Sequence, residues 1–137
     1  METIKLTAQE TSERFQAYKG MHGNRFTMLM DAYGEFQDSV AMWRDNNYVL
    51  FGLAEEAIEY QMATKAVKQQ FRGDTVTSEQ EIDRLKNVEK ELGDIFFFWY
   101  ANCKLWGLDP LEVIAKNVEK LSDRASRNVI KGDGDVR

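Results

Sequence analysis

The chain has 137 residues, a formal net charge of −5 and 43% hydrophobic residues. This length suits one domain, and this apolar content excludes a disordered chain. The acidic excess gives no long-range attraction toward polyanions, so neither nucleic acid nor an anionic membrane is expected as a partner. Cys103 is the only cysteine, and no apolar run is long enough to span a bilayer. We therefore expect a cytoplasmic protein without disulfides.

Apolar residues recur at helical spacings and strand-like alternation is scarce, which predicts an all-α fold. Gly20 and Gly23 are expected to break the chain between the first two helices. Ser78 and Glu81 have the spacing of a capping box, and Gly107 is the expected stop of the helix that follows Ser78. The predicted fold is a bundle of four to five helices, at about 8–19, 25–45, 48–71, 79–106 and from residue 110 onward.

Two of the expected helices have a defined apolar face. Asp109 is the expected N-cap of the last helix, with Pro110 at its first position and Glu112 completing a second capping box. The apolar stripe of this helix predicts packing against the rest of the bundle, and it consists of Leu111, Ile114, Val118, Leu121 and Ala125. The residues expected to face inward from the third helix are Leu50, Leu53, Ala54 and Ala57.

The segment 95–101, Ile-Phe-Phe-Phe-Trp-Tyr-Ala, is apolar nearly all round. A helix tolerates this only where it is covered on several sides. An interface between copies of the chain would supply such cover, and so would a central position in a monomeric bundle. The composition of the segment leaves both arrangements open.

Two of the expected helices carry acidic residues at helical spacing. Glu55, Glu56 and Glu59 point within a sector of roughly 100° on the third helix, and Glu91 and Asp94 lie roughly 60° apart on the fourth. Carboxylates at the margins of packed helices repel one another, so their convergence favours a hard divalent cation between them. Solvated helix faces show the same spacing, and the pattern alone leaves both interpretations open.

The spacing of these acids is not unique in the chain, and the residue types restrict which metal they could bind. The same spacing occurs at Glu10 and Glu13 and at Glu35 and Asp38. A di-iron carboxylate bundle requires Glu-x-x-His pairs, and His22, the only histidine, belongs to no such pair. Oxygen ligands without histidine point to Mg²⁺, or to Mn²⁺.

The chain contains four short motifs, in this order: Gly52-Leu-Ala-Glu-Glu-Ala-Ile-Glu59, Glu91-Leu-Gly-Asp-Ile-Phe96, Gly107-Leu-Asp-Pro110 and Asn117-Val-Glu-Lys-Leu-Ser-Asp-Arg124. The ordered set resembles the MazG-like branch of the all-α NTP pyrophosphatase superfamily, over about residues 48–137. This resemblance implies an Mg²⁺-dependent hydrolase that attacks the α-phosphorus of a (deoxy)nucleoside triphosphate and releases a monophosphate and pyrophosphate. It also implies a homodimer or homotetramer.

The resemblance assigns roles to particular residues. The Mg²⁺ ligands it implies are Glu56, Glu59, Glu91 and Asp94. Glu55 completes the catalytic set, either by supporting the metal site or by orienting the attacking water. The residues it implies for contact with the phosphates or the sugar are Asn117, Lys120 and Arg124. Lys120 and Arg124 lie four positions apart on one helix face, a spacing that suits two phosphates.

Three features depart from the family pattern. Ile58 stands where many members have glycine, the segment 60–90 is longer than usual, and the first 47 residues match no motif. We interpret the chain as a single domain with unmatched helices in 1–47, a motif-bearing core in 48–128 and a tail in 129–137. A dUTPase-like enzyme or a phosphoribosyl-ATP pyrophosphohydrolase of the same superfamily is an alternative. A non-catalytic helical interaction module, with the acids as its solvated face, is another.

Overall fold

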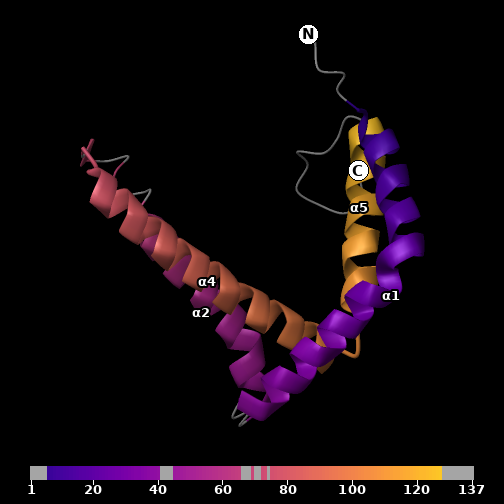
Figure 1. Ribbon diagram of the computed structural model, residues 1–137, viewed down its shortest axis with the longest axis horizontal. Coiled ribbons are helices and arrows are strands. Elements are labelled where there is room, and N and C mark those ends of the chain that lie inside the picture. Colours follow the sequence, from indigo (N-terminus) through magenta and orange to yellow (C-terminus); the bar gives the residue numbers. More distant parts are fainter. Residues whose placement is uncertain (1–5, 41–44, 66–68, 70–71, 74, 128–137) are drawn as a thin grey trace. The chain divides into compact units, whose positions relative to one another are not determined.

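The computed structural model describes residues 6–40, 45–65, 69, 72–73 and 75–127. The regular elements in these ranges are all helices, which confirms the all-α prediction (Figure 1). They are α1 (Ala8–Val40), α2 (Asn46–Thr64), α4 (Ser78–Leu105) and α5 (Pro110–Ser126). No helix within these ranges has both the length and the apolar character of a membrane-spanning segment. The chain divides into two compact units, one spanning residues 34–107 and the other the described parts of 1–33 and 108–137.

The break expected at Gly20 and Gly23 does not occur, because both residues lie inside α1. Glycine costs up to about 1 kcal/mol relative to alanine in a helix, which weakens a helix without ending it. At Gly23 a Cβ would lie 3.0 Å from Leu111 Cδ2, so glycine lets α1 and α5 approach closely. The prediction of two helices in this part of the chain was therefore wrong.

Helix α5 packs beside the N-terminal half of α1 (Figure 1). The Asp109 carboxylate accepts from the Leu111 N–H at 2.9 Å, and Pro110 occupies the first turn, as predicted. The second capping box was wrong, because the Glu112 carboxylate pairs with the Lys19 ammonium of α1 at 2.6 Å. The expected stripe is half-buried except for Leu121, which is exposed. The predicted tail, 129–137, lies outside the described residues.

Helix α2 ends earlier than the predicted residue 71. It begins after Asp45, whose carboxylate accepts from the Tyr48 N–H, and it ends at Thr64. Lys65 then adopts a left-handed conformation with φ of 54°. The Thr64 hydroxyl donates to the Gln61 carbonyl at 2.7 Å, and such local bonds compete with the helical pattern. Residues 66–68, 70–71 and 74 lie outside the described part of the chain.

Helix α4 begins with a capping box one residue before the predicted one. The Thr77 hydroxyl accepts from the Gln80 N–H at 3.2 Å, and the Gln80 side chain accepts from the Thr77 N–H at 3.0 Å. Thr77 and Gln80 have the same three-residue spacing as Ser78 and Glu81. Glu81 instead pairs with Arg84 at 2.9 Å. The expected stop at Gly107 is confirmed, with φ of 66°.

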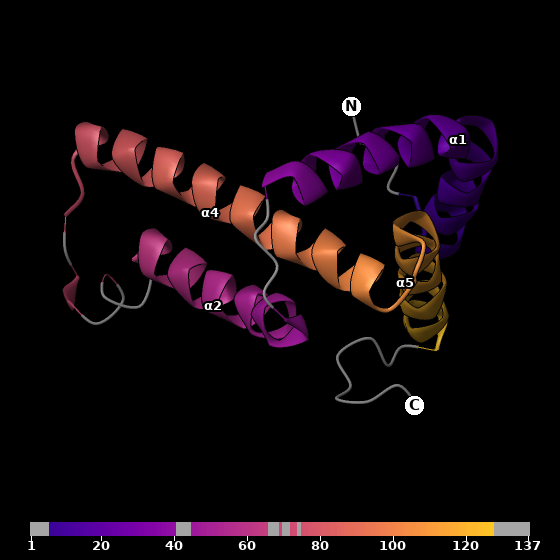
Figure 2. The same ribbon diagram turned by 90° about the horizontal axis from the view of Figure 1, so that it is seen from below.

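Helices α2 and α4 lie side by side in both views (Figures 1 and 2). Their closest approach is at Gly52, where an added Cβ would overlap the ring of Phe98. The Asn102 side-chain amide donates to the Val49 carbonyl at 3.1 Å across the same pair. The α2 residues buried here are Val49 and Gly52. The predicted inward face was therefore wrong by about one residue: Leu50, Ala54 and Ala57 are exposed and Leu53 is half-buried.

The apolar segment 95–101 is only partly covered within its own unit. Phe98, Tyr100 and Ala101 are buried, whereas Phe96 remains 40% exposed. The fully buried Gln37, near the end of α1, donates to the Phe97 carbonyl at 2.7 Å and so joins α1 to α4. The thiol of Cys103, two residues after this segment, is also buried.

The replacement Gly52→Ala should lower the stability of the protein. The added methyl group would force apart the closest contact between α2 and α4, and overpacking of this kind typically costs about 1–3 kcal/mol. Thermal unfolding followed by circular dichroism measures the loss. Gly20→Ala is the matched control, because a Cβ at that helical glycine meets nothing within 4 Å and should stabilise the helix slightly. Equal effects of the two replacements would contradict the packing argument.

Candidate functional site

The acidic residues of α2 and α4 meet because the two helices pack in opposite directions. Contacts pair Val49 with Asn102 and Gly52 with Phe98, so rising residue numbers in α2 match falling numbers in α4. One helical turn is 3.6 residues. The residues reached one and two turns beyond the glycine contact are therefore Glu56 and Glu59 on α2 and Asp94 and Glu91 on α4.

Three of these side chains form a compact group. Carboxylate oxygens of Glu56, Glu59 and Glu91 lie within 4.8 Å of one another. Among the described residues, this is the group of acids whose geometry could hold a metal ion. The pairs with the same spacing elsewhere behave differently: Asp38, for example, pairs with Lys104 at 2.7 Å. Spacing alone could not separate these pairs, whereas the packing of α2 on α4 does.

Glu56 is the most perturbed member of the group. Burial, followed by the negative charges of Asp94, Glu59 and Glu91, raises its pKa from 4.5 to about 7. The closeness of the Glu91 carboxyl adds to this shift. Near neutral pH the Glu56 carboxyl is therefore partly protonated when no cation is bound.

Two oxygens in the group lack a protein donor. Glu56 Oε2 and Glu91 Oε2 are both buried and accept no hydrogen bond from a described residue. A buried carboxylate oxygen without a donor is costly, and like charges around it raise that cost. A divalent cation removes both costs at once, and oxygen ligands alone suit Mg²⁺ or Mn²⁺. The residues present therefore fit a hard metal ion.

The remaining predicted acids are placed less centrally. Asp94 is half-buried and acts on Glu56 through its charge, but it lies outside the group of three. Glu55 is exposed and also lies outside that group. Its predicted role near the attacking water stays a prediction.

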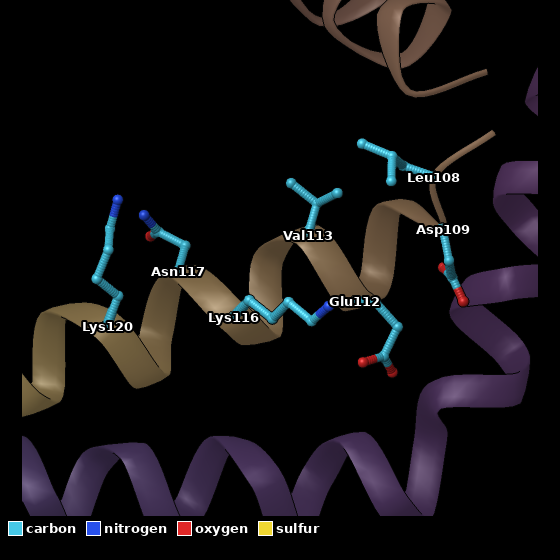
Figure 3. A pocket seen from close by; sticks show the side chains of 7 residues that line it. All are labelled: Leu108, Asp109, Glu112, Val113, Lys116, Asn117 and Lys120. Atoms are coloured by element: carbon cyan, nitrogen blue, oxygen red, sulfur yellow. The ribbon is translucent and has the colours of Figure 1, made fainter. Parts of the chain in front are cut away.

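The predicted nucleotide contacts lie on α5, in the other compact unit. Asn117 and Lys120 are exposed and extend to the same side of the helix (Figure 3). They line a pocket of about 390 Å³ together with Leu108, Asp109, Glu112, Val113 and Lys116. Arg124, expected on the same face as Lys120, is instead only 8% exposed. That these residues share one site with the acids remains a prediction.

Lys116 is a pocket residue that the sequence reasoning did not single out. It lines the same pocket as Asn117 and Lys120. Its charge helps to lower the pKa of Glu112, although the hydrogen bond and charge of Lys19 contribute more. The only signal in the sequence was its position next to Asn117, because a lysine on a helix face is usually a solvated side chain.

Without a metal, the protein should lose stability as the pH rises through the titration of Glu56. Its pKa is about 7 in the folded state and 4.5 ordinarily, so the folded state holds the proton more tightly. The free energy of unfolding therefore falls between these two pH values and levels off above them. In EDTA, Glu56→Gln should raise the melting temperature more at about pH 8 than at about pH 5. The exposed Glu10→Gln is the control, and the same gain at both pH values for Glu56→Gln would refute the shift.

Comparison with known proteins identifies the family of the chain. No curated protein and no solved structure showed significant similarity to the chain. The family of the MazG nucleotide pyrophosphohydrolase domain matches residues 45–129, which is more than half of the chain. The match includes α2, α4 and α5 and begins just before α2, so that α1 lies outside it. The chain therefore belongs to the MazG nucleotide pyrophosphohydrolase domain family.

Proposed function

We propose that the protein hydrolyses (deoxy)nucleoside triphosphates to monophosphates and pyrophosphate with Mg²⁺ as cofactor. The observation that carries the proposal is the pair of buried carboxylate oxygens, on Glu56 and Glu91, that lack a protein donor. They lie within the part of the chain that matches a nucleotide pyrophosphohydrolase family. This combination favours catalysis over a solvated acidic face.

The acids divide into metal ligands and a water-positioning group. Glu56, Glu59, Glu91 and Asp94 would hold Mg²⁺, which when bound neutralises phosphate oxygens that gain charge during hydrolysis. Glu55 is exposed one position before Glu56. We assign it to orient the attacking water and to accept its proton.

Side chains of α5 would bind the anionic part of the substrate. The exposed Lys120 ammonium supplies positive charge for a phosphate, and the Asn117 amide supplies both a donor and an acceptor. Arg124 belongs to this set through the family resemblance alone, because its burial favours a role in fixing α5. The substrate is thus a nucleoside triphosphate, with the base and sugar to be determined by assay.

Removing charge from the acidic group should abolish turnover. Glu56→Gln and Asp94→Asn keep the side-chain shape but each removes one ligand charge, so hydrolysis should fall by orders of magnitude while the fold survives. The assay measures pyrophosphate release over all ribo- and deoxyribonucleoside triphosphates, with Mg²⁺ and with EDTA. The panel also includes phosphoribosyl-ATP, and a single strongly preferred substrate, dUTP or phosphoribosyl-ATP, would identify the narrower enzymes of the superfamily.

The controls are Glu10→Gln and Glu35→Gln, which alter exposed acids of α1. These residues share the three-residue acidic spacing but lie outside the family match. They should retain wild-type turnover. If all four variants keep it, or all four lose it equally, the site does not lie between α2 and α4. No hydrolysis of any nucleotide by the wild type would favour an interaction module instead.

We further propose that the protein is a homodimer or homotetramer. Helices α2 and α4 leave a large apolar surface exposed in their own unit, and such surfaces usually mark an interface. The most exposed large hydrophobic side chains on α4 are Leu85 at 66% and Ile82 at 54%, and on α2 they are Met62 at 69%, Phe51 at 64% and Ile58 at 57%. Their recurrence along both helices suits helix packing between two copies.

Light scattering should give a mass of at least two chains at micromolar concentration. Leu85→Lys places a charge in the exposed apolar surface and should shift the protein toward a monomer. Asn87→Lys is the control, because it adds the same charge at an exposed polar position of α4. A monomeric wild type, or equal effects of both substitutions, would refute the interface.

A further inference from the structure

A cluster of basic side chains lies where the chain passes from α2 to α4. Lys65, Arg72 and Arg84 line one pocket of about 420 Å³. The remaining lining residues are Gln69, Thr75, Val76 and Gln80, so that none of the described lining residues is acidic. In a chain with a net charge of −5, three cations around one pocket are a local reversal of sign. Such a reversal favours an anionic ligand.

Only one of these three cations has a carboxylate partner among the described residues. Arg84 pairs with Glu81 at 2.9 Å. Neither the Lys65 ammonium nor the Arg72 guanidinium has a carboxylate partner among the described residues, and both residues are exposed. Lys19 of α1, by contrast, pairs with Glu112 at 2.6 Å. The pocket therefore keeps the charge of two cations for a ligand.

The pocket also holds its polar groups in fixed positions. The Gln69 side-chain oxygen accepts from Arg84 Nη1 at 2.8 Å, which leaves its amide N–H groups as donors. The Gln80 side-chain oxygen accepts from the Thr77 N–H in the capping box, which leaves the Gln80 amide N–H groups as donors too. The Arg84 Nε–H is buried and has no acceptor. The lining therefore offers donors and cations, which is the complement of a phosphate group.

We propose that this pocket binds a phosphate group, either free or as part of a small phosphorylated molecule, without a metal ion. The pocket is separate from the acidic group, because Arg84 precedes Glu91 by two turns of α4, or about 10 Å along the helix. An anion here would pair with Lys65 and Arg72 and take the donors of the two glutamines. The phosphate class of ligand follows from the cations and donors that line the pocket. Binding of such a ligand would be a function in addition to the proposed hydrolysis.

Calorimetric titration with inorganic phosphate in EDTA and at low ionic strength tests this site. The wild type should bind phosphate saturably, and the double variant Lys65→Gln/Arg72→Gln should bind at least about tenfold more weakly, since each charged hydrogen bond contributes about 1.5–3 kcal/mol. Lys86→Gln/Lys90→Gln removes two exposed cations of α4 that do not line the pocket, and it should bind as the wild type does.

Parallel titrations with pyrophosphate and with a nucleoside monophosphate identify the source of the phosphate. Tighter binding of pyrophosphate than of the monophosphate assigns the pocket to a free polyphosphate, and the opposite order assigns it to a nucleotide. Absence of saturable binding, or equal weakening in both double variants, would overturn the proposal. Because the titrations contain no metal and require no turnover, their result is independent of the hydrolysis assay.

Discussion

The ring of Phe98 rests on the backbone of α2 at Gly52, where an added Cβ would overlap the ring. This contact sets the distance between α2 and α4, and helical geometry then brings the acids one and two turns away into contact. Oxygens of Glu56, Glu59 and Glu91 reach within 4.8 Å of each other only because the helices are this close. The geometry of the acidic group thus depends on the packing of the Phe98 ring against Gly52.

The acidic group is unfavourable as a purely structural feature. Burial and three neighbouring charges raise the pKa of Glu56 to about 7, and two buried oxygens have no donor. Proteins retain such groups where a ligand compensates them, and perturbed carboxyl groups are concentrated at functional sites. The acidic group lies within residues 45–129, the part of the chain that matches the MazG family. This location is the basis for proposing a metal-dependent hydrolase.

The sequence predicted the all-α fold and the two acidic helices, because periodicity and acid spacing depend on local order alone. It misplaced the inward face of α2, since Gly52 has no side chain to mark its burial while Leu50 and Ala54 do. The break predicted at Gly20 was also wrong, because a glycine inside a helix does not end it unless it adopts the left-handed conformation of a C-cap residue. The basic pocket could not be seen in advance, because Lys65 and Arg84 are distant in sequence and line one pocket only when α2 and α4 pack in opposite directions.

The central claim is that the acids of α2 and α4 hold a divalent cation. Crystals grown with Mn²⁺ and measured for anomalous scattering test it most directly, because the signal locates the ion without assuming any activity. The account predicts an anomalous peak bonded to oxygens of Glu56, Glu59 and Glu91, at the roughly 2.0–2.2 Å typical of small divalent ions with carboxylates. Full data without a peak between these helices, or with the peak only elsewhere in the molecule, would contradict it.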